Sequence, residues 1–269
     1  MIITRISGGL GNQMFQYAIA KSIAKRKNDT FKLDNSFYSK QTLRKYELNL
    51  FYIEENISTE NENILLRGKE DLMYRIRKKL NFPINRPSTY INEKKNSFFD
   101  KSIFSIKNDM YIDGFWQNEN YFIDLKDSLI KDFTAKKELS LEGKNQLLKI
   151  RNTESVSVHV RRGDYVQDNH TNTIHGICDL NYYINSTIII NEKINNAIFY
   201  IFSDDIKWCK ENFSFLKNKV YIDDTKSAVE DLELMKNCNH NIIANSTFSW
   251  WGAWLNTNKN KIVISPKIW

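Results

Sequence analysis

Cysteine is scarce in this sequence. The 269 residues include three cysteines, with no C-x-x-C spacing and no even-numbered set: Cys178, Cys209 and Cys238. This usage argues against a disulfide-built scaffold and favours a reduced compartment. The first twenty residues also lack a basic segment followed by a long apolar one. We therefore expect no signal peptide and predict a cytoplasmic protein.

Long apolar runs are absent as well. No run reaches the ~20 residues that a helix needs to cross a bilayer, so no membrane span is predicted. The net charge of +7 favours an anionic partner. A phosphorylated small molecule, a nucleic acid and a peripheral contact with the acidic surface of an inner membrane are all compatible with it.

Several nucleotide and metal motifs are missing too. The absence of G-x-x-x-x-G-K-[ST] argues against nucleotide hydrolysis of the phosphate-loop kind, and the N-terminal glycine turn is not G-x-G-x-x-G. Neither D-x-D nor H-E-x-x-H occurs, and four histidines give little support to a metal site. We therefore predict that no metal is required and that arginine neutralises any departing diphosphate.

The second half of the chain alternates strand-like and helix-like segments. The apolar segments are "SVSVHV", "AIFYIF", "KVYID", "NIIA" and "KIVIS". Strands that alternate with helices at this spacing predict βαβ crossovers and a parallel sheet. The N-terminus adds a strand over 2–6, a glycine turn, a helix from Met14 to about Lys27 and a strand "FKLD". Residues 35 to about 110 show no clean period and are predicted to be irregular with some helices.

These patterns predict an α/β fold with a Rossmann-like C-terminal domain and a second α/β domain at the N-terminus. The predicted boundaries are an N-terminal domain over 1–134, a polar helical connecting segment over 135–153 and a C-terminal domain over 154–269.

Charge gathers at the end of the predicted strand "SVSVHV". The strand includes His159 and is followed by Arg161, Arg162, Gly163 and Asp164. Ligands of open parallel sheets bind beyond the carboxyl ends of the strands, and the planar donors of arginine match phosphate oxygens. The alternative is a solvated Arg–Asp turn that only closes the strand.

Other strand ends carry polar residues that fit the same ligand. "AIFYIF" leads into Asp204, and "NIIA" leads into Ser246 and Thr247 at a helix start, where N–H groups and hydroxyls suit a phosphate. Simple N-capping is the alternative for these two hydroxyls. In the N-terminal half, three glycines allow close backbone approach to a ligand and two amides are expected to offer it donors: Gly8, Gly9, Gly11, Asn12 and Gln13. Together these ends predict a site for a diphosphate.

Aromatic rings can stack on the apolar faces of sugars. Trp116 and Gln117 follow Gly114 on a predicted loop, which makes them candidates for acceptor contact. Trp250 and Trp254 are four residues apart on a predicted helix and are expected in the core.

Five motifs, in chain order, resemble those of a known family. "GGLGNQMFQYA", "GFWQNENYF", "HVRRGDY", "IFSDD" and "NSTFSWWGAWL" are similar to the successive signatures of the α-1,2-fucosyltransferases, glycosyltransferase family eleven. "HGICDLNYY" is similar to the family's central segment. Family members usually continue past the last strand, so a C-terminal tail is expected to be absent from this chain.

The resemblance implies a GT-B-like arrangement of two Rossmann-like domains that face each other across a cleft. It also implies GDP-fucose as donor, no metal and inversion at the fucose anomeric carbon. It implies that Arg161 binds the β-phosphate with support from Arg162. His159 and Asp204 would contact the guanine side of the donor. Asn12, Ser246 and Thr247 would contact the diphosphate, and Gly11 in the glycine loop would also bind the donor.

Inversion calls for a base near the acceptor hydroxyl. Asp164 is the first candidate because it lies on the arginine turn, and His175 is the second. The alternative for Asp164 is an ion pair that orients Arg161 or Arg162.

By resemblance, the predicted activity is that of a bacterial galactoside 2-α-L-fucosyltransferase acting on a β-galactoside of an O-antigen-type precursor, with a lipid-linked acceptor as one option. A fucosyltransferase of different linkage or acceptor, such as a protein O-fucosyltransferase, is the alternative, and an inactive sugar-nucleotide binder is a weaker one. A nucleic-acid-binding module is disfavoured because the basic residues are scattered along the chain. No nucleic-acid partner is therefore predicted.

Overall fold

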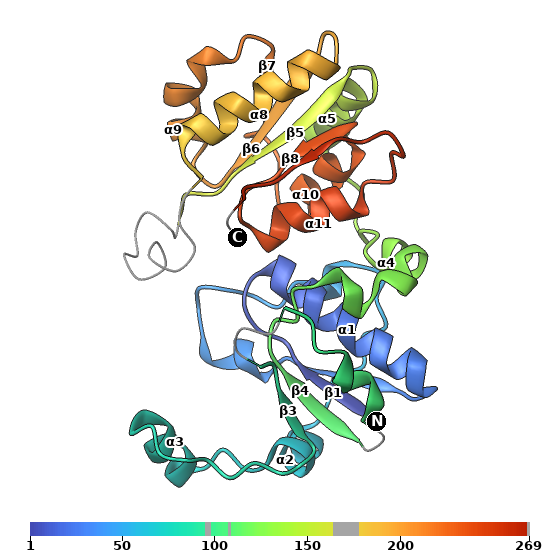
Figure 1. The fold of residues 1–269 in the computed structure, drawn as a ribbon, viewed down its shortest axis with the longest axis vertical. Coiled ribbons are helices and arrows are strands. Elements are labelled where there is room, and N and C mark those ends of the chain that lie inside the picture. Colours follow the sequence, from blue (N-terminus) through green and yellow to red (C-terminus); the bar gives the residue numbers. More distant parts are fainter. Residues whose placement is uncertain (95–97, 107–108, 164–177, 268–269) are drawn as a thin grey trace. The chain divides into compact units, whose positions relative to one another are not determined.

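The chain folds into two compact units. The computed structural model describes residues 1–94, 98–106, 109–163 and 178–267. The first unit comprises Met1–Lys136 and the second comprises Lys137–Trp269. Figure 1 shows that each unit contains its own sheet flanked by helices. No described helix combines the length and the apolar character needed to cross a bilayer.

The first unit is built on a four-stranded parallel sheet of order β2-β1-β4-β3. Its elements are β1 (Ile2–Arg5), α1 (Leu10–Lys27), β2 (Phe31–Asp34), α2 (Glu60–Arg67), α3 (Leu72–Lys79), β3 (Tyr90–Asn92), β4 (Met110–Asp113) and α4 (Lys126–Asp132), with short 3-10 turns at Ser36–Lys40, Leu48–Leu50, Lys101–Ser105, Glu119–Tyr121 and Ile123–Leu125. Helix α1 ends in three basic residues, whose charges favour a helix C-terminus, and Asn28 follows in the left-handed region with φ 49°. The predicted strand, glycine turn and helix at the N-terminus are therefore confirmed.

The second unit contains a five-stranded parallel sheet of order β7-β6-β5-β8-β9. Its elements are α5 (Leu141–Arg151), β5 (Ser155–Val160), α8 (Leu180–Lys193), β6 (Ile198–Ser203), α9 (Ile206–Asn212), a 3-10 turn at Phe213–Phe215, β7 (Lys219–Tyr221), α10 (Ala228–Asn237), β8 (His240–Ile242), α11 (Thr247–Leu255) and β9 (Val263–Ile264). All six residues of β5 are buried, as expected of a central strand covered on both faces. The prediction of an α/β fold with two parallel sheets is confirmed.

The predicted connection over 135–153 contains a helix that packs within the second unit. Helix α5 begins after Ser140, whose hydroxyl accepts the N–H of Gly143, and it lies against α10. The carboxylate of Glu230 on α10 accepts the Ser140 N–H at 2.6 Å and the Lys226 N–H at 2.7 Å. This buried carboxylate therefore fixes the start of α5 to the loop that precedes α10.

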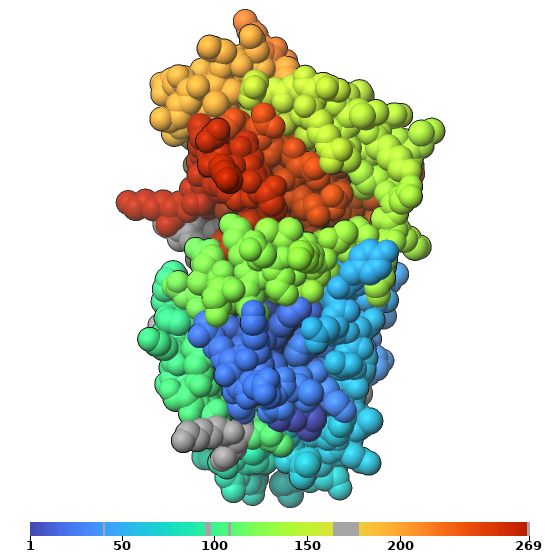
Figure 2. Space-filling view, turned by 90° about the vertical axis from the view of Figure 1, so that its right-hand side faces the viewer, coloured from blue at the N-terminus to red at the C-terminus, as the bar shows by residue number. Residues whose placement is uncertain are grey.

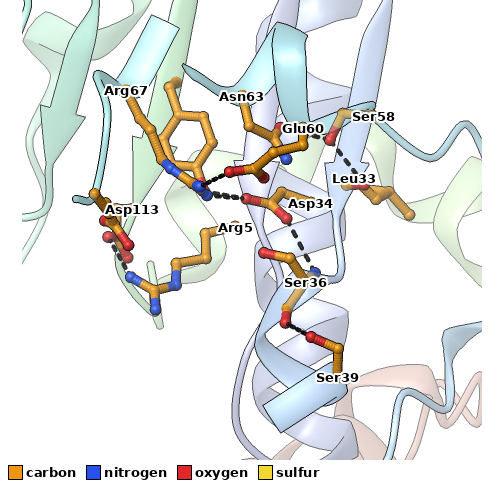
Figure 3. A network of polar contacts seen from close by, with 12 residues as sticks. Arg5, Leu33, Asp34, Ser36, Ser39, Ser58, Glu60, Asn63, Arg67 and Asp113 are labelled. Atoms are coloured by element: carbon orange, nitrogen blue, oxygen red, sulfur yellow. Dashed lines mark hydrogen bonds and ion pairs between the residues drawn. The ribbon is translucent and has the colours of Figure 1, made fainter. Parts of the chain in front are cut away.

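A network of ion pairs lies at the carboxyl ends of strands of the first sheet (Figure 3). Arg67 on α2 lies 2.9 Å from an oxygen of Asp34 and 2.8 Å from Glu60. The Tyr111 hydroxyl donates to the same Asp34 oxygen at 2.5 Å. Asp34 is 2% exposed, so its charge depends on these two donors and on the Ser36 N–H.

Replacing Arg67 with methionine is expected to lower the free energy of unfolding by about 3–5 kcal/mol, because Asp34 is left charged and buried. Adding Asp34→Asn to Arg67→Met should recover part of this loss. Lys144→Met is the matched control, since it removes an exposed ion pair with Glu138 and should cost at most about 1 kcal/mol. Urea unfolding at neutral pH measures all three. Equal effects of Arg67→Met and Lys144→Met would contradict the network's role.

Candidate functional site

The carboxyl edge of the second sheet has a reversal of strand order beside β5. From β5 the chain proceeds to β6 and β7 on one side, and then returns to β8 on the other side. Such a switch point leaves a crevice beyond the carboxyl ends of the two strands, where open α/β sheets bind ligands. Here residues 161–163 follow β5 and residues 243–247 follow β8. Topology therefore brings the arginine turn and the start of α11 to one place.

Arg161 is held by an aspartate from the neighbouring strand. Its Nη1 lies 2.8 Å from Oδ2 of Asp204, which follows β6. The other oxygen of Asp204 accepts the backbone N–H of Arg162 at 2.9 Å. Both carboxylate oxygens are thus used by the arginine turn. Asp204 was predicted on the guanine side of the donor, and the structure places it as a clamp on Arg161.

The next position of the turn has no room for a side chain. A Cβ on Gly163 would lie 2.8 Å from Oδ2 of Asp204, which is closer than real Cβ contacts. Glycine at this position therefore allows the backbone to pass directly over the carboxylate that holds Arg161.

Arg162 contacts α9. Its guanidinium lies 3.8 Å from the centroid of the Trp208 ring, and its Nε lies 3.6 Å from Asp205. Stacking on an indole stabilises the charge of a guanidinium but does not accept its N–H groups, and the buried Nε has no hydrogen-bond partner among the described residues. The two adjacent arginines therefore differ: Arg161 pairs with a carboxylate at the switch point, and Arg162 packs on helix α9. The supporting role that the resemblance implies for Arg162 stays a prediction.

His159 lies beneath the arginine turn. It is 5% exposed, and its ring centroid lies 5.7 Å from that of Phe248 on α11. Among the described residues no group hydrogen-bonds its Nδ1. Burial, together with the positive charge of Arg161, lowers the pKa of His159 from 6.5 to about 4. The imidazole is therefore neutral near pH 7.

This pKa shift predicts a pH dependence of stability. Above pH 6.5 His159 is neutral in both states and adds no slope. Between pH 6.5 and about 4 the unfolded chain binds a proton that the folded protein does not. The free energy of unfolding should therefore decrease as the pH is lowered from 6.5 to about 4. This residue alone should account for a decrease of up to about 3 kcal/mol. His159→Gln should show a correspondingly shallower fall in denaturant titrations, and identical slopes would contradict the assignment.

The N-terminus of α11 is not capped by a side chain. Ser246 occupies the N-cap position with extended backbone angles, and its hydroxyl makes no capping hydrogen bond. Ser246 and Thr247 are both partly exposed. The N-capping alternative for Ser246 is therefore not what the structure shows. The first-turn N–H groups and the two hydroxyls form a set of donors suited to an anion.

The first unit contains a second set of predicted residues. Gly8 has φ +79°, a conformation that favours glycine, and it turns the chain from β1 into α1. Asn12 lies in the first turn of α1, and its Oδ1 accepts from Nε2 of Gln117 at 2.9 Å. Gly11 is buried one residue earlier in the helix. Asn12 and Gln117, both predicted site residues, are thus in contact although 105 positions separate them.

Two other amides of α1 are used inside the first unit. Gln13 donates to the carbonyls of Gly8 and Lys45 and accepts the N–H of Glu47. The expectation that Gln13 offers a donor to a ligand is therefore wrong. Gln16, which the sequence did not single out, accepts the Ser7 N–H and donates to the Gly114 carbonyl. It ties the turn after β1 to the turn after β4.

Trp116 is buried. It is 2% exposed, has φ +54°, and packs edge-on against Tyr121 with ring centroids 5.6 Å apart. The carboxylate of Glu93 accepts the N–H groups of Phe115 and Trp116 at 2.7 and 3.0 Å. This placement favours packing over the acceptor stacking that was predicted. Glu93 had no sequence signal, because it precedes the turn by more than twenty residues.

The two candidate bases, Asp164 and His175, lie outside the described residues. Within 1–94, 98–106, 109–163 and 178–267 no three His, Cys, Asp or Glu side chains form a group that could hold a metal ion. Metal independence stays a prediction, which transfer assays with a chelator present can test.

Solved structures share this fold. The chain resembles POFUT1 in complex with GDP-fucose, with a TM-score of 0.54, 12% identity and coverage of 99% of this chain and 98% of that one. It also resembles the NodZ alpha-1,6-fucosyltransferase soaked with GDP-fucose, with a TM-score of 0.50, 14% identity and coverage of 94% and 91%. At this identity the likeness concerns the fold, which is that of GT-B-like fucosyltransferases.

Sequence comparison defines the family. The chain belongs to glycosyl transferase family 11, whose sequence model matches residues 1–269. It is 38% identical to an alpha-1,2-colitosyltransferase of Escherichia coli, over 100% of this chain and 92% of that protein. It is 32% identical to the O-antigen biosynthesis glycosyltransferase WbnK of Escherichia coli, over 98% and 93%. The human galactoside alpha-(1,2)-fucosyltransferase 1 is 28% identical over 54% of this chain and 42% of its own length. The resemblance drawn from the motifs is confirmed, and the protein is a glycosyltransferase.

Proposed function

We propose that this protein is an inverting galactoside α-1,2-fucosyltransferase that transfers fucose from GDP-fucose to a β-galactoside of an O-antigen-type precursor. The observation that carries the proposal is the guanidinium of Arg161, held by Asp204 at the switch point of the second sheet. The names of the bacterial relatives support a surface-glycan role, and the names of the galactoside relatives support the α-1,2 linkage.

In this proposal Arg161 stabilises the charge that develops as GDP leaves. Cleavage of the fucose–phosphate bond places negative charge on the β-phosphate while the sugar becomes oxocarbenium-like. A fixed cation aimed at that charge stabilises the transition state more than the ground state. Because Asp204 already holds one guanidinium nitrogen, Arg161 needs little reorganisation when the charge appears.

The other donor contacts would surround the diphosphate. The Ser246 and Thr247 hydroxyls and the first N–H groups of α11 supply neutral donors, and Asn12 is assigned to the diphosphate by family resemblance. His159, neutral at physiological pH, can donate or accept a hydrogen bond on the donor nucleotide. Asp164 is proposed as the base that takes the acceptor proton, with His175 as the second candidate. An ion pair that orients the arginines is the alternative for Asp164.

The decisive experiment offers GDP-fucose and a panel of β-galactosides to the purified protein in the presence of a chelator. We expect a fucosylated product whose α-1,2 linkage is read by NMR. Incorporation only after a divalent metal is added would overturn the metal-independent mechanism. A different linkage would overturn the proposed activity, and transfer to folded protein domains instead of free galactosides would favour the protein O-fucosyltransferase alternative.

A colitose donor is the second candidate, because a colitosyltransferase is 38% identical over the whole chain. Colitose differs from fucose by the loss of the 3-hydroxyl. A site that hydrogen-bonds this hydroxyl would reject the deoxy sugar by up to about 10⁴–10⁵-fold, whereas an apolar contact would discriminate about 10–200-fold or less. Competition between the two GDP-sugars in one assay, with kcat/KM for each, decides between them.

A further inference from the structure

Helix α3 exposes apolar side chains along one side. Leu72, Met73, Ile76 and Leu80 are 73%, 57%, 44% and 58% exposed, and Phe82 just beyond the helix is 59% exposed. No residue of α3 is buried. In Figure 1 the helix lies apart from the sheet of the first unit, and the same segment lies at the lower margin of that unit in Figure 2. A surface helix of a globular protein normally turns its apolar side inward.

The polar side of α3 is the side that contacts the protein. Arg86 donates to the Tyr74 hydroxyl at 2.7 Å, and its guanidinium lies 4.5 Å from the Tyr74 ring centroid and 4.3 Å from that of Tyr90 on β3. It also pairs with Glu70 at 2.8 Å. Tyr74 is the one residue of α3 that is partly buried. Contacts through Tyr74 thus fix the rotation of the helix.

Helical geometry then sets the direction of the apolar side chains. At ~100° per residue, Leu72, Met73, Ile76 and Leu80 fall within an arc of about 100°, whose centre lies roughly 145° from Tyr74. This arc, which we call the α3 stripe, therefore faces away from the unit. The packing that holds the helix leaves the stripe in contact with solvent.

Positive charge surrounds the α3 stripe. Half of the eight helix residues are cations, and none is acidic: Arg75, Arg77, Lys78 and Lys79. Arg77 and Lys79 lie on the two margins of the stripe, about 40° and 20° from its edges. An apolar arc bordered by Lys and Arg is the pattern of a helix that lies in a membrane interface, with its cations at the anionic headgroups.

We infer that α3 is a docking surface for an anionic lipid membrane, on which the protein rests peripherally. The charge decides the occupant: two copies pairing through this stripe would bring their cations together, whereas anionic headgroups neutralise them. A lipid-linked acceptor would be met at such a surface, but the inference does not depend on the proposed function, since it concerns binding alone.

The test is flotation of the full-length protein with vesicles of phosphatidylcholine, with and without phosphatidylglycerol. We expect salt-sensitive binding that requires phosphatidylglycerol. Leu72→Ser/Ile76→Ser/Leu80→Ser should weaken the binding at least about tenfold. Arg77→Gln/Lys79→Gln should weaken it roughly fivefold for each charge.

The matched control is Leu141→Ser/Leu148→Ser on α5, where both leucines are similarly exposed, at 72% and 59%. It should leave vesicle binding unchanged. Circular dichroism and thermal unfolding establish that each variant is folded. Absence of wild-type binding, or equal loss in the α5 control, would overturn the inference. So would a dimer in sedimentation analysis that the stripe variant abolishes without any vesicle binding, since the stripe would then belong to a second copy of the chain.

Discussion

Arg161→Ala is expected to reduce kcat for fucosyl transfer by about 10²–10³-fold, because a fixed donor aimed at the developing diphosphate charge is lost. Arg161→Lys should not restore activity. A guanidinium can pair with Asp204 through Nη1 and still present other N–H groups to a phosphate, whereas an ammonium on a flexible stem lacks this planar fork.

The control is Arg151→Ala, which removes an exposed arginine of the same unit that donates to Asn237. It should retain wild-type kcat. Transfer, donor hydrolysis and thermal unfolding should be measured on all three variants. Near-normal turnover in a folded Arg161→Ala protein would refute the assignment of this residue to the leaving group.

Asp204→Asn is expected to lower kcat by about 10²-fold with little loss of stability. The amide oxygen can still accept the Arg162 N–H, but the amide NH₂ would then face the Arg161 guanidinium, and two donors repel. Small misplacements of a group that stabilises the transition state cost about this factor.

The split between kcat and KM distinguishes the two roles considered for Asp204. A residue that positions Arg161 should affect kcat, while the guanine contact implied by the family resemblance should raise KM for the donor and leave kcat unchanged. Asp223→Asn is the control, because Asp223 is an exposed carboxylate of the same unit that pairs with Lys210. It should leave kcat near the wild-type value.

Much of the fold could be predicted because its signals are local. The valines of "SVSVHV" and the glycines of "SGGLGNQ" specify a strand and a turn within a few residues, and both were predicted correctly. Strand β3 could not be predicted, because a three-residue strand shows no period and is formed by pairing with β4. Helix α2 had a signal that was overlooked: Thr59 and Glu62 form a capping box.

The sequence predicted which residues belong to the candidate site much better than it predicted which side chains they contact. Asn12 and Gln13 are adjacent amides with the same local pattern. Yet the side chain of Gln13 donates a hydrogen bond to the Lys45 carbonyl, whereas that of Asn12 accepts one from Gln117. Trp116 looked like a loop aromatic, and its burial depends on Tyr121 and Glu93. Such contacts depend on which strands are neighbours in the sheet. The hydrophobic periodicity of one segment does not predict that strand order.

The sequence by itself determined the element types of the second half, the family and the positions of the arginine turn and the glycine turn, because these depend on motifs and on periods of a few residues. Only the tertiary structure decided that Asp204 clamps Arg161, that Arg162 stacks on Trp208 and that the apolar side of α3 faces outward. These contacts join side chains that are tens of residues apart in the sequence. They form because parallel pairing places particular strand ends next to each other, and the sequence of a single segment does not specify that pairing.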